Sequence, residues 1–280
     1  MRMTATTEFQ RGVTLVELLV VIAILAIISG IVAVFIQRPV EGYTSAAQRA
    51  ELSGAADTAL RRISRDLHRA LPNSVRIAAS GGKQYLEFLL TTGGGRYRAQ
   101  VDGGGGGNIL DFTTADGSFD VIGPMPALAA GDSIVVYNLF SSPSVSASNA
   151  YFGDDRAAYG SNITTTITLS APKQFPFASP SSRFQVVQGP VTYECDPATG
   201  VVRRYSGYTI TLAQGTPPSG GTSSLLVNGV TGCSFTYDNA ISNAALRTGL
   251  VSLSLQLART NGSASENVNL FEQVHVDNSP

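Results

Sequence analysis

An apolar run near the start of the chain, residues 13–36, constrains the fold more than any other feature of the sequence. Between Arg11 and Arg38 the only ionisable side chain is Glu17. A helix of about 20 apolar residues is long enough to cross the roughly 30 Å hydrocarbon core of a bilayer. The sequence therefore predicts a membrane-inserted helix.

The charges around this run do not follow the order of a secretory signal peptide. Such a peptide has basic residues, then a short apolar region, then a cleavage site of small residues. Here Arg2, Glu8 and Arg11 precede the run, and no Ala-x-Ala-like site follows it. Cleavage is therefore expected before the run, which keeps the helix and leaves Glu17 close to a new amino terminus at Val13.

Residues 12–20, Gly-Val-Thr-Leu-Val-Glu-Leu-Leu-Val, resemble the class III signal of type IV pilins and type II secretion pseudopilins, written G-F-T-L-x-E. The resemblance implies that residues 1–12 are a leader, removed after Gly12 by a prepilin peptidase that also N-methylates Val13. Glu17 then occupies the position of the family's glutamate, which acts in assembly. Val13 stands where Phe is usual, and cleavage should remain intact because the peptidase depends mainly on the glycine.

The carboxylate of Glu17 is energetically unfavourable within the predicted membrane helix. A carboxylate in hydrocarbon costs about 2.5–3.5 kcal/mol on insertion scales, and such residues usually have a partner. The ammonium group of Val13, from the same or a neighbouring subunit, is one candidate. The alternative is that Glu17 lies at the interface beside the lipid headgroups. Pairing across subunits would set the register of an assembled fibre.

Residues 37–71 predict an amphipathic continuation of the helix. One face carries small and apolar side chains at steps of three and four residues, namely Ala46, Ala50, Ser53, Ala56, Leu60, Ile63, Leu67 and Ala70. Pro39 is expected to kink the helix or melt it locally. Leu71 is a plausible end, because the residue before a proline is pushed out of the helical region. This half should pack against a folded domain.

Residues 72–280 predict a head rich in β-strands. Apolar and β-branched runs, the last of them alternating strictly, occur at residues 85–90, 132–137, 163–169, 184–187, 191–194, 201–205, 233–237 and 250–257. No second segment has a helical period of comparable strength. The predicted class is α+β, with the long N-terminal helix packed on an antiparallel sheet, as in pilins.

The two cysteines, Cys195 and Cys233, lie far beyond the membrane segment. If this side of the chain is periplasmic, they should form a disulfide, because that compartment maintains disulfides. Closing the loop would add roughly 4 kcal/mol on the chain-entropy model. A metal or redox pair is the alternative, but the chain has no Cys-x-x-Cys and only two histidines, His68 and His275.

Two clusters outside the signal are candidate binding sites. Asp154 and Asp155 fit either a contribution to a calcium site or a solvated loop, and the latter is favoured because calcium needs six to eight oxygens. The second cluster lies on the predicted helix and consists of Arg61, Arg62, Arg65 and Arg69. It fits a phosphate footprint for DNA or a solvated face. The solvated face is favoured, since Asp66 lies four residues after Arg62 and no aromatic side chain is interleaved.

Other sequence features argue against a phosphate-binding or catalytic site. The five-glycine run 103–107 lacks the lysine of a phosphate-binding loop and predicts a hairpin tip. His68 and His275 have no recognisable catalytic motif around them. We therefore expect no active site, no metal and no cofactor. The net charge of −1 provides no general attraction to nucleic acid.

The C-terminal third, with residues 232–238 and 271–280, resembles the large minor pilins of the mannose-sensitive haemagglutinin (MSH) pilus. That MshO group is related to the assembly protein PilW and the minor pseudopilin GspJ. The resemblance implies a single-pass inner-membrane protein with a periplasmic head that joins other minor pilins and the major pilin at a tip. A GspJ-type pseudopilin and a membrane-anchored adhesin remain alternatives, and an anchored enzyme is disfavoured.

Overall fold

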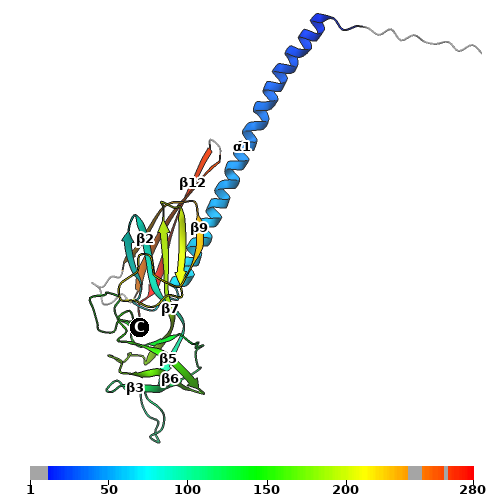
Figure 1. The fold of residues 1–280 in the computed structure, drawn as a ribbon. Helices are drawn as coiled ribbons and strands as arrows, with labels where there is room; N and C mark the ends of the chain where they lie inside the picture. Colours follow the sequence, from blue (N-terminus) through cyan, green and yellow to red (C-terminus); the bar gives the residue numbers. More distant parts are fainter. Residues whose placement is uncertain (1–11, 239–247, 262–263) are drawn as a thin grey trace, which may run out of the picture. The chain divides into compact units, whose positions relative to one another are not determined.

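The computed structural model describes residues 12–238, 248–261 and 264–280, so the predicted leader lies outside the described residues apart from Gly12. The chain divides into two compact units, Met1–Ala50 and Glu51–Pro280. One long helix and twelve strands make up the described elements (Figure 1). The predicted α+β class, with an apolar N-terminal helix and a large antiparallel β-domain, is confirmed.

Helix α1 spans Leu15–Leu67 and covers 53 residues. Its helical assignment is unbroken through Pro39 and Gly42, so the local melting that the sequence predicted as one of two outcomes does not occur. The end at Leu67 is four residues earlier than the expected stop. The next residues form a turn, and Ala70 makes an isolated bridge to Leu90.

The part of α1 in the second unit buries one face. Ala46 and Ala50, at the start of the expected stripe, are exposed. Burial begins at Leu52 and follows the helical period through residues that include two the sequence stripe had omitted, Leu52 and Ala59. The buried apolar side chains of this part are Leu52, Ala56, Ala59, Leu60, Ile63 and Leu67.

The strands form two antiparallel sheets. The larger sheet has nine strands, which are β1 (Arg76–Ser80), β2 (Lys83–Tyr97), β3 (Asp116–Ile122), β4 (Ser133–Val135), β5 (Arg156–Ile163), β6 (Thr166–Lys173), β7 (Arg183–Asp196), β8 (Val201–Ser206) and β9 (Thr222–Asn228). The smaller sheet has three, which are β10 (Val230–Asp238), β11 (Thr248–Asn261) and β12 (Ala264–Asp277).

Strands β2 and β7 are the longest of the larger sheet, and they organise it. Residues 84–90 of β2 pair with residues 189–195 of β7, and residues 91–96 pair with residues 183–187. The second set also belongs to a closed circuit in which β2 pairs with β3, β3 with β6, β6 with β5, β5 with β4, and β4 with β7. We call this circuit the barrel, and Figure 1 shows its strands β3, β5 and β6 beyond the end of β2.

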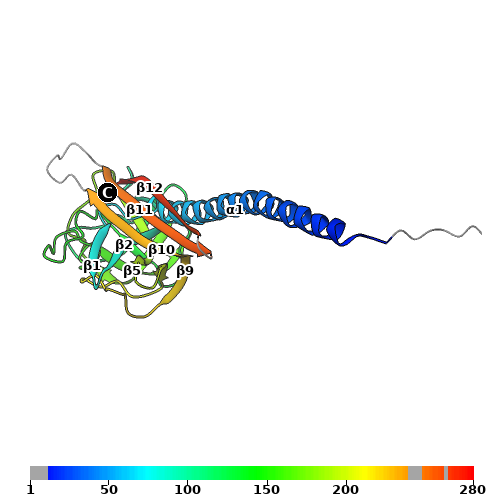
Figure 2. The same ribbon diagram turned by 90° about the horizontal axis from the view of Figure 1, so that it is seen from above.

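The other halves of β2 and β7 belong to a layered substructure that we call the sandwich. It combines them with β1, β8 and β9, the small sheet and the second part of α1 (Figure 2). The sandwich core joins helix, large sheet and small sheet through side chains such as Leu60, Phe88, Tyr193 and Leu255. The barrel has its own core, in which Phe119 and Phe184 meet edge to face with ring centroids 5.4 Å apart. A third, smaller cluster includes Leu71, Leu89 and Tyr151, so the described head has two main cores connected by two continuous strands and one minor core.

Two strand predictions are wrong in detail. Residues 163–169 form the hairpin between β5 and β6 rather than one strand, and Thr164 takes a positive φ of 54° in the turn. Three consecutive threonines favour a strand, so the sequence does not signal a turn there. Residues 184–187 and 191–194, predicted as two strands, are one strand, β7. Pro190 is tolerated because β4 pairs only up to Val187 and β8 begins opposite Val191.

Candidate functional site

The predicted processing segment lies at the start of α1. Residues 12–14 are not helical, and the helix begins at Leu15. The backbone N–H of Glu17 donates to Oγ1 of Thr14 at 3.3 Å, and the N–H of Leu18 donates to the Thr14 carbonyl at 3.1 Å. Thr14 is therefore the N-cap of the helix.

Thr14 and Glu17 have the spacing of a capping box, in which Ser or Thr precedes Glu or Gln by three residues. A carboxylate in the first turn is also favoured by the positive end of the helix dipole. The sequence reasoning missed Thr14, although the Thr-x-x-Glu spacing was the signal that identifies it. Because the helix begins only after this cap, Gly12 and Val13 lie in a non-helical peptide, which contains the expected cleavage bond.

The helix that follows is apolar on all sides and uncovered within its own unit. Leu15–Ala33 has a mean hydropathy of 3.0 and is the one stretch of the described residues that is long and apolar enough to cross a membrane as a helix. Val13 is 71% exposed and Leu15 is 79% exposed. A contiguous apolar surface of this size requires lipid or other helices against it. Pairing of Glu17 with an ammonium group stays a prediction.

Cys195 and Cys233 form a disulfide with their Cα atoms 6.5 Å apart. Cys195 belongs to β7 and Cys233 to β10, so the bond connects the large sheet to the small sheet. The described chain contains no free cysteine, which leaves neither sulfur for the alternative metal or redox role.

The solvated-loop interpretation of Asp154 and Asp155 is wrong for Asp155, which is fully buried. Neither carboxylate oxygen of Asp155 has a hydrogen-bond partner within the described structure, and Oδ2 of Asp154 also lacks one. Burial, followed by the neighbouring Asp154, raises the pKa of Asp155 to about 8, while Arg156 and Lys173 act in the opposite direction. The described residues contain no group of three His, Cys, Asp or Glu side chains around a common point, so calcium stays a hypothesis here.

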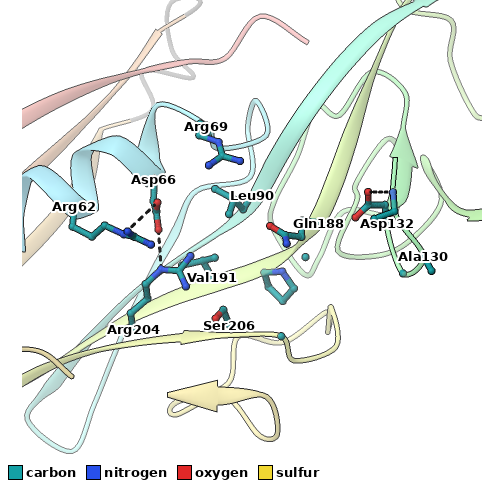
Figure 3. Close-up of a pocket in the computed structure, with 15 residues that line it drawn as sticks. Arg62, Asp66, Arg69, Leu90, Ala130, Asp132, Gln188, Val191, Arg204 and Ser206 are labelled. Carbon is teal, nitrogen blue, oxygen red and sulfur yellow. Dashed lines mark hydrogen bonds and ion pairs between the residues drawn. The ribbon is translucent and has the colours of Figure 1, made fainter. Parts of the chain in front are cut away.

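The arginine cluster on α1 divides into two kinds of residue. Arg61 is a solvated helix residue and pairs with Asp57 at 2.7 Å. Arg62 and Arg69 are also exposed, as the solvated-face interpretation expects, and both line a cleft together with Arg204 (Figure 3). Asp66, predicted to pair with Arg62, lies 3.8 Å from Arg62 Nε and is buried. Asp66 also binds Arg204 and Tyr193, which no local pattern around Asp66 predicts.

The two histidines lie on the surface, and two aspartates of the barrel, Asp116 and Asp120, have structural roles. His68 and His275 are both exposed. Asp116 accepts hydrogen bonds from the backbone of Asp111 and Ser118, and Asp120 binds Thr166, Asn108 and Arg98. These carboxylates hold turns and strand ends of the barrel.

Comparison with known proteins places a family model on the N-terminal segment. The model of the prokaryotic N-terminal methylation motif matches residues 9–33. No curated protein and no solved structure matches the chain. The match thus covers the capped helix start and the apolar stretch, and leaves the head to be interpreted from its own geometry.

Proposed function

From the N-terminal methylation motif, which indicates a type IV pilin-like, processed and membrane-anchored protein, we propose that the chain is a minor pilin. It is cleaved after Gly12 by prepilin peptidase, methylated on Val13, and held in the inner membrane by one helix with its head in the periplasm. It takes part in initiating or tipping an MSH-like type IV pilus, together with other minor pilins and the major pilin.

The observation that carries this proposal is the match of residues 9–33 to the methylation motif on a helix with an entirely exposed apolar surface. An anchor alone needs only apolar length. Placing the Glu17 carboxylate in hydrocarbon costs free energy, and a simple anchor gains nothing from it. When helices of neighbouring subunits pack in lipid, the same carboxylate sets their register. The capped start at Thr14 presents that carboxylate one turn into the helix.

The size of the head supports a place at a filament end. The barrel is inserted between β2 and β7 and adds a second core to the sandwich. A subunit in the middle of a filament must leave room for the next subunit above it, while a tip subunit has no such limit. The disulfide between β7 and β10 suits an oxidising compartment.

Processing is tested by the intact mass and N-terminal sequence of the protein from membranes of cells with a prepilin peptidase. The expected chain begins at N-methylated Val13. The variant Gly12→Val should retain the leader, and Val13→Phe, which restores the usual residue, should be cleaved normally. A wild-type chain that still begins at Met1, or one cut after Phe35, would refute the proposal.

Assembly is tested separately with Glu17→Ala and Glu17→Gln. Both variants should reach the membrane and be cleaved, but should fail to enter filaments or to support filament formation. A GspJ-type pseudopilin would give the same result only with a type II secretion system present. A membrane-anchored adhesin would be displayed and would bind equally well with Ala at position 17, which would contradict a filament role.

A further inference from the structure

A cleft of about 590 Å³ lies where the sandwich meets the barrel. Its walls come from the end of α1, the middle of β7, the end of β8 and the loop before β4, and Figure 3 shows several of its polar side chains grouped around it. This volume is within the range of small-molecule sites, which often lie at junctions between substructures. The polar side chains that matter below are Arg62, Arg69, Gln188, Arg204 and Ser206.

Asp66 positions two of the arginines. Its carboxylate, which is buried, accepts hydrogen bonds from Tyr193 OH at 2.7 Å and from Arg204 Nε at 2.8 Å, and lies 3.8 Å from Arg62 Nε. Arg204 is thus held through Nε by a hydrogen bond, whereas Arg62 is about half exposed and makes only an ion pair with Asp66. Both contacts run through Nε, so the terminal nitrogens lie on the other side of each guanidinium group. Guanidinium groups held in this way offer paired N–H donors to a planar oxyanion.

Arg69 supplies a third guanidinium and is held from both ends. Its carbonyl accepts hydrogen bonds from the backbone N–H and the hydroxyl of Thr91, and its side chain donates to the Thr91 carbonyl at 3.1 Å. These contacts fix the residue after the helix has ended at Leu67. Arg69 remains exposed, so its other nitrogens are accessible from the cleft.

Gln188 reaches the cleft because of a bulge in β7. Leu90 pairs with Gly189 and Thr91 pairs with Val187, which leaves Gln188 as the extra residue. Bulges commonly redirect a side chain beside a binding site. The exposed amide of Gln188 and the hydroxyl of Ser206 thus add neutral donors and acceptors to the arginines.

The lining restricts the chemistry of a ligand. Three arginines face two carboxylates, Asp66 and Asp132, so the cleft has a formal charge of about +1, which suits a single negative charge better than a polyphosphate. Among the described residues no aromatic side chain lines the cleft, so these residues offer a nucleobase no stacking surface. The apolar lining from Leu90, Pro190 and Val191 is too small for an acyl chain.

We propose that this cleft binds a small acidic saccharide, with the carboxylate on the arginines and the ring hydroxyls on Gln188, Ser206 and nearby backbone groups. The inference goes beyond the filament role and does not depend on it. Hydrogen bonds to charged groups are stronger than neutral ones, so loss of one arginine should weaken binding by roughly tenfold or more.

The test is calorimetric titration of the full chain in detergent with glucuronate up to about 10 mM, which detects dissociation constants in the millimolar range. Glucose serves as the neutral probe and acetate as the bare carboxylate. Saturable binding of glucuronate is expected, with weaker binding of both other probes. Arg69→Gln should weaken glucuronate binding roughly tenfold or more. Arg65→Gln changes an exposed arginine on α1 outside the cleft and should leave glucuronate binding unchanged.

A second variant, Gln188→Ala, removes a side chain of the cleft at an exposed bulge and leaves every arginine in place. It should weaken the binding of glucuronate but not the binding of acetate. The thermal midpoint of each variant should match the wild type. Absence of glucuronate binding would overturn the proposal. So would equal binding of acetate, equal binding of glucose, or an Arg65→Gln effect as large as that of Arg69→Gln.

Discussion

Asp155→Asn is expected to stabilise the head above pH 7 and to have little benefit at pH 4. The carboxyl group is fully buried, and neither of its oxygens has a hydrogen-bond partner within the described structure. The groups that act on it electrostatically are Asp154, Arg156 and Lys173, the last of which is held by the Gly153 carbonyl at 2.8 Å. A buried carboxyl without partners is more stable protonated than charged.

The sign and size follow from the pKa of Asp155, which burial raises from 3.8 to about 8. The folded state then binds more protons than the unfolded state at any pH between these values, so the free energy of unfolding falls as pH rises through this window. Each pKa unit corresponds to about 1.4 kcal/mol, which makes the total loss on the order of 5 kcal/mol. An asparagine amide in the same place keeps some unsatisfied polar atoms, so we expect a net gain of about 2–3 kcal/mol at pH 8.

The assay is thermal unfolding of the full chain in detergent from pH 4 to pH 9, followed by near-ultraviolet circular dichroism of the tyrosines, because the chain has no tryptophan. For a head of this size, 1 kcal/mol shifts the midpoint by about 2–4 °C. The wild-type midpoint should fall between pH 5 and pH 8, and the Asn variant should show a flatter curve.

Parallel pH curves for wild type and variant would refute this account of Asp155. A cation held by Asp154 and Asp155 predicts the opposite slope, because protonation would compete with the ion and stability would rise with pH. In that case a chelator would lower the wild-type midpoint, and Asp155→Asn would destabilise the head. The same experiment therefore decides the calcium hypothesis.

Three further predictions concern other parts of the chain. Reducing the Cys195–Cys233 disulfide, which closes a separation of 38 residues, should cost up to about 4 kcal/mol of unfolding free energy; an unchanged thermal midpoint after complete reduction would contradict the role of the bond between the sheets. Glu87→Ala should cost about 3–5 kcal/mol, since it leaves Arg76, whose side chain is only 10% exposed, without its carboxylate; a loss below about 1 kcal/mol in chemical unfolding, the range of exposed pairs, would argue against it. Thr14→Val should remove the N-cap, worth about 1 kcal/mol, and fray the first turn of α1, whereas Thr14→Ser should not; amide exchange at residues 15–18 in micelles measures this, and equal protection in both variants would exclude the cap.

Much of the helix was predictable because its signals are local. The apolar run, the single Glu17 and the Thr-x-x-Glu spacing concern residues within a few positions of each other, and a helix satisfies its own backbone. The apolar stripe also identified most of the buried face from Ala56 to Leu67. Its error at Ala46 and Ala50 arises because periodicity marks a face but not where the covering domain begins.

The strands were predictable as a class and less so as a topology. Strict alternation located β11, an apolar run located the first half of β2, and antiparallel pairing followed from the number of short runs. The single strand β7 was divided in two because Gly189 and Pro190 are usual strand breakers. Their tolerance depends on which neighbours β7 has at that point, and no local pattern contains this information.

The sequence by itself determined the apolar helix of membrane-crossing length, the expected processing point and the α+β class, because each depends on composition and on spacing along one segment. The tertiary structure alone decided the burial of Asp155, the closed circuit of the barrel and the arginine-lined cleft. Asp66 and Arg204, which order that cleft, are 138 positions apart. Burial and charge pairing depend on which distant segments the fold brings together. A carboxylate that loses its water in this way has a raised pKa and favours the protonated form, unless a partner charge compensates for the lost hydration.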